Sequence, residues 1–263
     1  MLRRWLYGFS WLCLACTLGR AAGQETVAGR PKDTEVWQPV PPIAAPGTAA
    51  TGAAPPADAI VLFSGSDLDE WVNTRDGAPA EWTLRGGRLI VDKAVGNIET
   101  RRHFRNFQLH LEYRVPEGIT GEGQARGNSG LFLASTGEGD RGYELQILDS
   151  YGNDTYVNGM AGSVYKQSPP LVNASRRPGA WQVYDVVWTA PTFGSDGALR
   201  TPARVTAFFN GVVVQNDFVL LGETVYIGAP RYVAHGDAPI KLQAHGDPSP
   251  PIAFRNIWVR PLP

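Results

Sequence analysis

Cysteine is almost absent from this sequence. The 263 residues include two cysteines, Cys13 and Cys16, and both lie near the start of the chain. Everything after position 16 therefore lacks a thiol nucleophile, a thiolate metal ligand and a disulfide. A fold without such links depends on a sizeable apolar core, and hydrophobic residues make up 43% of the sequence.

Charge is also sparse. Asp, Glu, Lys and Arg together account for 19% of the residues, and the formal net charge is −1 at pH 7. Lysine and arginine form no basic stripe, so we expect no nucleic-acid partner. The sequence contains no zinc-protease motif, serine-hydrolase elbow or complete calcium loop. Its four histidines are isolated along the chain: His103, His110, His235 and His245.

One apolar run occurs, over Trp5–Leu18. It follows two arginines and precedes Ala21-Ala22-Gly23, which are the small residues of a signal-peptidase site. We therefore expect residues 1–23 to be an export signal, with a periplasmic or extracellular destination. The run is short for a bilayer and no second one follows, so no membrane span is expected. The alternative to cleavage after Gly23 is a lipid anchor attached at Cys16.

Residues 24–57 are rich in proline and alanine. Such a composition buries little surface, so it predicts a disordered spacer that can be removed without loss of fold or activity. Trp37 is the only aromatic residue of this segment, and it is the one side chain that we expect to be able to pack on the domain. Residues 58–263 then form a single globular domain.

This domain consists largely of short segments in which polar and apolar residues alternate. They are rich in β-branched and aromatic residues and are bounded by Gly, Pro, Asn or Asp. The expected strands are Arg88–Val91, Phe107–Val115, Gly130–Ala134, Tyr143–Leu148, Tyr184–Trp188, Arg204–Phe209, Val212–Gln215 and Ile252–Val259. Asn210-Gly211 predicts a two-residue hairpin of type I′. Since no long helical period appears, the fold class is all-β, a two-sheet antiparallel β-sandwich of the jelly-roll type.

Strand periodicity separates polar from apolar faces in two of these segments. His110, Glu112 and Arg114 share one face of the first strand, and Glu144 and Gln146 share one face of the second. We expect both strands to lie in one sheet and to form the polar floor of a concave sugar-binding surface. Glu112 and Glu144 would then lie within the width of one ligand. The alternative is that these are ordinary solvated faces. Four tryptophans beside the strands are expected to be buried: Trp71, Trp82, Trp188 and Trp258.

Several motifs resemble those of a known family, the 3-keto-disaccharide hydrolases. The similar blocks, in chain order, are Leu62–Trp71, Phe104–Arg114, Asn128–Gly130, Tyr143–Asp149, Gly162–Tyr165, Pro178–Gln182, Asn210–Val212 and Phe254–Arg260. Ser64 and Gln182 depart from the usual asparagines. The resemblance implies a concanavalin A-like sandwich that acts on glycosides oxidised at C3 of the sugar.

A ketone at C3 acidifies the proton on C2, so elimination of the C1 oxygen followed by hydration gives net hydrolysis. Such a site needs a base, an acid and a group that stabilises an enolate. Glu144 is the first candidate for the base or a metal ligand and Glu112 the second, while Tyr165 or His110 is the candidate acid. The expected substrate contacts are Arg114, Asn128, Ser129, Gln146, Asp149 and Lys166.

No cofactor is required by the sequence, although a divalent cation is an alternative electrophile. Two other functions remain open. One is a non-catalytic carbohydrate-binding module of the same fold. The other is a retaining glycosidase, which needs two carboxylates about 5–5.5 Å apart.

Overall fold

The computed structural model of the protein describes residues 29–46 and 54–263. The expected export signal, Cys13 and Cys16 lie outside the described residues. Strands dominate the described part, and its helical segments are three short 3₁₀ turns: η1 (Pro31–Thr34), η2 (Gly123–Ala125) and η3 (Val157–Gly159). This described part includes no helix with the length and apolarity needed to cross a bilayer.

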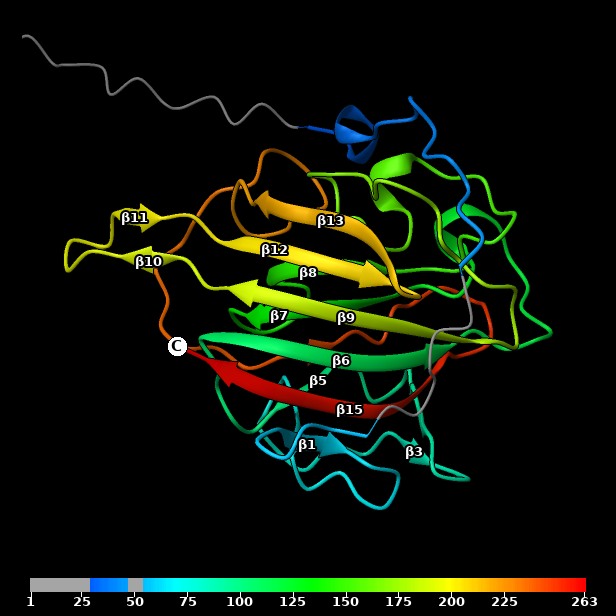
Figure 1. Ribbon diagram of the computed structural model, residues 1–263, viewed down its shortest axis with the longest axis horizontal. Helices are drawn as coiled ribbons and strands as arrows, with labels where there is room; N and C mark the ends of the chain where they lie inside the picture. Colours follow the sequence, from blue (N-terminus) through cyan, green and yellow to red (C-terminus); the bar gives the residue numbers. More distant parts are fainter. Residues whose placement is uncertain (1–28, 47–53) are drawn as a thin grey trace, which may run out of the picture.

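Two antiparallel sheets pack face to face, with the larger sheet in front in Figure 1. The larger sheet runs in the order β13 (Val212–Val219), β12 (Arg204–Phe209), β9 (Trp181–Thr189), β6 (Asn106–Arg114), β15 (Ala253–Leu262), β4 (Leu89–Ile90) and β3 (Thr83–Leu84), with β1 (Ile60–Phe63) also paired to β15. The smaller sheet runs in the order β2 (Trp71–Asn73), β5 (Ile98–Thr100), β14 (Lys241–Leu242), β7 (Ser129–Ser135) and β8 (Gly142–Ile147). A hairpin of β10 (Thr192–Phe193) and β11 (Leu199–Thr201) projects from one end.

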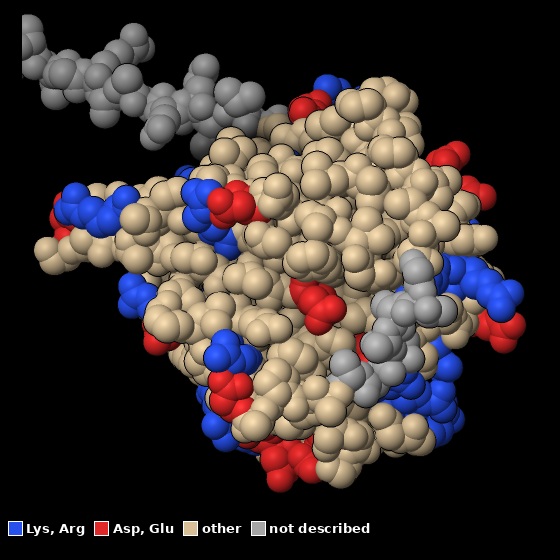
Figure 2. Space-filling model, in the orientation of Figure 1, with Lys and Arg blue, Asp and Glu red and all other residues tan. Residues whose placement is uncertain are grey.

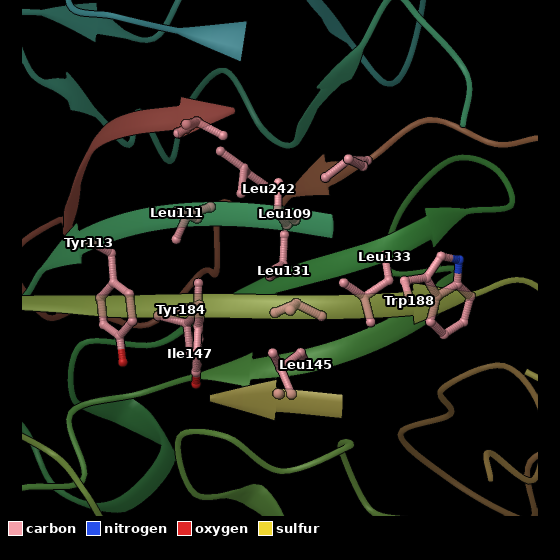
Figure 3. Packing of buried hydrophobic residues seen from close by; sticks show 14 of the residues in the cluster. Leu109, Leu111, Tyr113, Leu131, Leu133, Leu145, Ile147, Tyr184, Trp188 and Leu242 are labelled. Carbon is pink, nitrogen blue, oxygen red and sulfur yellow. The ribbon is translucent and has the colours of Figure 1, made fainter. Parts of the chain in front are cut away.

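The core fills the space between the two sheets, as Figure 3 shows. Side chains from β6 and β9 on one sheet meet side chains from β7 and β8 on the other. These include Leu109, Leu111, Tyr113, Tyr184, Trp188, Leu131, Leu133, Leu145 and Ile147. The alternation predicted for the two polar-faced strands is therefore confirmed. The four tryptophans are buried, with exposed fractions between 0% and 5%.

The predicted β-sandwich and the predicted hairpin at Asn210-Gly211 are confirmed. Asn210 and Gly211 have φ angles of 53° and 81°, and they join β12 to β13 at the pair Phe209 and Val212. Two positive φ angles are what a type I′ turn requires. Asn210 also accepts a hydrogen bond from the Val183 amide at 2.9 Å and donates to Ala174 O at 2.8 Å. The turn thus fixes the register of the hairpin and ties it to β9.

Charged side chains are few across the middle of the outer face of the larger sheet (Figure 2). Most lysine and arginine side chains in this view lie around its rim, on the left and at the lower right.

Residues 30–44, named the N-terminal strap below, differ from the expectation of a spacer without contacts. The strap begins at η1 and runs along the domain to a parallel bridge between Ile43 and Asn173. Its Trp37 ring meets the edge of the Tyr156 ring, with centroids 6.2 Å apart. The strap is held mainly by hydrogen bonds of its backbone, which composition does not reveal.

Candidate active site

The main cavity opens on the outer face of the smaller sheet, beside β7 and β8. Its volume is about 680 Å³, within the range of pockets that bind small molecules. Two strand residues contribute to its wall, Glu144 and Gln146 from β8. The remaining lining comes from loops: Glu35, Gln124, Ala125, Asn128, Asp140, Tyr156, Tyr165, Thr224, Tyr226, Gln243, His245, Gly246 and Asp247.

Glu144 is the buried carboxyl of this cavity, with an exposed fraction of 6%. Its backbone amide donates to Thr224 Oγ1 at 3.0 Å. A Cβ at Gly130 would lie 2.5 Å from Glu144 Oε1, so glycine is needed there to leave room for the carboxyl. Burial raises the pKa of Glu144 well above its usual range. Asp140 adds to this effect, and Lys241 opposes it.

A chain of amides leads from the protein interior to Glu144. Gln124 Nε2 donates to Gly159 O at 2.9 Å, which directs Gln124 Oε1 toward Gln146. Gln146 Nε2 donates to that oxygen at 3.0 Å. Gln146 Oε1 then lies 3.0 Å from Glu144 Oε1 and 3.0 Å from the carbonyl oxygen of Ser129. An amide oxygen beside a carboxylate oxygen is repulsive unless one of them carries a proton.

Reversing Gln146 lets its Nε2 donate to both Glu144 Oε1 and Ser129 O, and it places the Gln146 oxygen against Gln124 Oε1. Reversing both amides moves that contact to Gln124 Oε1 and Gly159 O. With Gln146 reversed, either form of Glu144 accepts its hydrogen bond. The case for a protonated acid at Glu144 is therefore its burial, which raises its pKa.

His245 and Asp247 form a second chemical group of the cavity. His245 Nδ1 lies 3.0 Å from Asp247 Oδ2. The Asp247 amide also lies 3.3 Å from Nδ1, but the shorter contact with a carboxylate decides the tautomer, with the proton on Nδ1. Burial opposes ionisation of Asp247, yet hydrogen bonds from His245, Ser249 and Lys93 outweigh it and hold its pKa below the usual range. Nε2 of His245 is then an acceptor with no partner among the described residues, as a general base requires.

Two tyrosines face each other in the cavity wall. The hydroxyl oxygens of Tyr156 and Tyr165 are 2.6 Å apart. Burial raises the pKa of Tyr156 to about 12 and that of Tyr165 further. Both hydroxyls therefore stay protonated, and since one donates to the other, the pair has one O–H left for a ligand. Gln243 Oε1 is buried without a partner in the described chain, so it is an acceptor available to a ligand hydroxyl.

The expectation that Glu112 and Glu144 share one sheet face is wrong. Glu112 lies on β6, which pairs with β9 and β15 in the larger sheet, whereas Glu144 lies on β8 in the smaller one. Since both strands turn their apolar faces to the common core, the two carboxyls lie on opposite outer faces of the sandwich.

Glu112 belongs instead to a buried ionic network with His110. Glu112 Oε2 accepts from Arg255 Nε at 2.7 Å, and His110 Nδ1 lies 2.7 Å from Asp185 Oδ1. Burial lowers the pKa of His110, but Asp185 and Glu112 outweigh it and raise that pKa to about 9. Neither His110 nor Glu112 lines the cavity.

The structure gathers part of the expected site. Asn128, Gln146 and Tyr165 join Glu144 in the cavity wall. The other expected substrate contacts are engaged elsewhere. The guanidinium of Arg114 stacks on Trp181, Ser129 Oγ donates to Gln243 O, Asp149 pairs with Arg126, and Lys166 Nζ donates to Pro31 O and Tyr226 O.

Loop residues were missed by the sequence analysis. His245 and Asp247 follow β14, Tyr156 precedes η3, and Asp140 lies between β7 and β8. No periodicity marks such positions, and only the short His-x-Asp spacing hinted at the pair. In the described ranges, no group of three or more His, Cys, Asp or Glu side chains is placed to hold a metal ion.

Together the fold and the cavity define a class, the jelly-roll β-sandwiches with a ligand-sized cavity on the outer face of one sheet. The chain belongs to the family of the 3-keto-alpha-glucoside-1,2-lyase-like domain, whose model matches residues 58–260. This match confirms the resemblance seen in the sequence motifs.

Relatives agree with this assignment. A 3-keto-disaccharide hydrolase of Bacteroides thetaiotaomicron is 29% identical over 112 residues, which cover 38% of this chain and 33% of that protein. The match thus spans about a third of the length of this curated relative. A crystal structure from Parabacteroides distasonis ATCC 8503, provisionally assigned as a glycosyl hydrolase, is 51% identical with a TM-score of 0.76 and covers 88% of this chain and 96% of its own. A second structure from that organism, at 18% identity and a TM-score of 0.57, covers 78% and 94% and shows the shared fold.

Proposed function

We propose that this protein is an exported enzyme that cleaves 3-keto-glycosides by elimination and hydration. The observation that carries the proposal is the presence of two groups in one cavity, a buried carboxyl with a raised pKa at Glu144 and an imidazole oriented by a carboxylate at His245. The family and the Bacteroides relative supply the substrate class.

The proposed reaction begins with a proton transfer. His245 Nε2 removes the proton from C2, and its electron pair forms the enolate with the C3 carbonyl. Asp247 stabilises the imidazolium that results. Within the pair of Tyr156 and Tyr165, one hydroxyl donates to the other, and the second hydroxyl is the donor at hand for the enolate oxygen.

Departure of the leaving group is the second step. The enolate electrons form the C1–C2 double bond, the C1–O bond breaks, and Glu144 gives its proton to the leaving oxygen. Water then adds to C1 while C2 regains a proton, so the sum is hydrolysis. This assignment replaces the expectation that Glu144 is the base, because a group that holds its proton in the folded state is an acid.

Isotope exchange tests both roles. The protein is incubated in D₂O with a p-nitrophenyl 3-keto-α-glucoside and with its unoxidised parent, with and without EDTA. We expect p-nitrophenol from the keto sugar alone. His245→Gln should lose deuterium uptake at C2 and p-nitrophenol release by about 10²-fold or more. Glu144→Gln should keep C2 exchange and be impaired in release.

The control variant is Glu122→Gln, a change at an exposed glutamate outside the cavity. Cleavage of the unoxidised glucoside without deuterium uptake would contradict the proposal and favour a retaining glycosidase. Binding of the sugar without cleavage would favour the carbohydrate-binding module.

A further inference from the structure

The N-terminal strap is fastened to the domain on both sides of the cavity wall. Asn158, which is buried, donates from Nδ2 to Thr34 O at 3.0 Å and accepts from the Val36 amide at 3.0 Å through Oδ1. The Val157 amide donates to Val36 O at 2.6 Å. Lys166 Nζ donates to Pro31 O at 2.6 Å. The backbone on either side of position 35 is therefore fixed.

A second attachment lies ten residues further along the chain. The Ala44 amide donates to Asn173 O at 3.1 Å, and the Asn173 amide donates to Pro42 O at 2.9 Å. Between the two attachments, Trp37 packs on Tyr156, which is itself a cavity residue. Because the strap is held at two points, its conformational entropy is lost when the protein folds and not when a ligand binds.

Glu35 is the strap residue that lines the cavity. It is half-buried, and its Oε2 accepts from Trp37 Nε1 at 3.3 Å. The remaining lone pairs of a carboxylate are free to accept from vicinal hydroxyls, as sugars present them. With Asp140 and Asp247, Glu35 gives the cavity an acidic lining that favours a neutral sugar over one bearing a carboxylate or phosphate.

We propose that the strap is part of the substrate site and that Glu35 is a substrate-binding residue for neutral sugar hydroxyls. This proposal rests on the proposed function and adds a segment outside the matched family domain, which begins at residue 58. It also reverses the expectation that residues 24–57 are dispensable.

The test uses full-length protein and two strap substitutions. Glu35→Ala removes the carboxylate, and we expect KM for the p-nitrophenyl 3-keto-α-glucoside to rise about tenfold or more while kcat changes less than twofold. Asp33→Asn is the matched control. It lies two residues away, pairs with Arg30 at the surface and does not line the cavity. Its KM should stay at the wild-type value.

Val36→Pro undocks the strap without touching the domain. It deletes the amide that donates to Asn158, at a side chain that is 41% exposed. Amide exchange of Ala44 and KM should both increase. In this background Glu35→Ala should add no further rise in KM, because a released strap no longer presents the carboxylate.

The outcomes separate the two proposals. If the wild type cleaves the keto sugar and both strap variants keep its KM, the strap proposal fails and the proposed function stands. A lower KM after undocking also overturns it, since the strap would then be an obstacle. If the wild type binds the keto sugar calorimetrically but does not cleave it, the proposed function fails. The role of Glu35 is then tested by binding: Glu35→Ala should raise the Kd for the keto sugar about tenfold or more.

Discussion

Replacing Glu144 by glutamine should change how stability depends on pH. Glutamine imitates the protonated acid, which is the form that burial of Glu144 favours. An unfolded glutamate titrates near pH 4.3. Below that pH both states of the wild type hold the proton, so wild type and Glu144→Gln should unfold with similar free energy.

Above pH 4.3 the unfolded wild-type chain releases a proton that the folded protein keeps. The folded pKa is raised, so stability is greatest below the unfolded pKa and falls as pH rises toward the folded pKa. The slope for one proton is about 1.4 kcal/mol per pH unit. The variant lacks this term, so above pH 4.3 it should gain up to about 1.4 kcal/mol per pH unit relative to the wild type until the folded pKa is reached.

Urea unfolding at half-unit steps between pH 4 and pH 8 measures this difference. Glu122→Gln is the control for loss of a glutamate, and it should follow the wild type because its side chain is exposed. Parallel curves for wild type and Glu144→Gln would refute the reasoning. They would show that Glu144 is ionised in the folded state and that Gln146 donates to it.

Three further predictions concern other buried groups. His110 has a folded pKa raised to about 9, so the stability it contributes below pH 6.5 should be lost between pH 6.5 and 9, by roughly 3 kcal/mol; urea titrations of His110→Gln should lack this loss. Lys241→Met removes an ammonium that donates to Gly137 O, Gly139 O and Arg141 O; amide exchange in the loop that carries Asp140 should accelerate, and equal protection would refute the role. Asn210→Ala leaves the Val183 amide and Ala174 O unpaired, so the free energy of unfolding in urea should fall by about 3 kcal/mol or more. Asn210→Gly, which keeps the positive φ without strain, should lower it by a similar amount if the hydrogen bonds dominate.

Local pattern was sufficient to predict which side of a strand faces the core. Leu109, Leu111 and Tyr113 on β6, and Leu145 and Ile147 on β8, are buried as their alternation indicated. The same pattern says nothing about which sheet a strand joins, because that choice depends on pairing with strands far along the chain. Glu112 was therefore placed beside Glu144 although the sandwich separates them.

The chemical partners of Glu144 were beyond sequence reasoning for a related reason. His245, Asp247 and Tyr156 lie in loops, where function is common but periodicity is absent. The strap is held by backbone bonds to Asn158 and Asn173, and a proline- and alanine-rich composition carries no sign of them. What could be read from the family motifs was the position of Glu144, whereas its raised pKa follows from burial that only the structure shows.

The place of β15 in the larger sheet has a consequence for how the chain acquires its fold. β15 follows every other strand in chain order, yet it lies between β6 and β4 and also pairs with β1. Before Ala253–Leu262 arrive, β6 has an open edge and β1 has no partner in the larger sheet. Such distant pairing is slow, because loop closure costs entropy before contacts offset it. A nascent chain therefore stays incompletely folded until β15 has been synthesised, and during that time its open β6 edge needs protection from other chains.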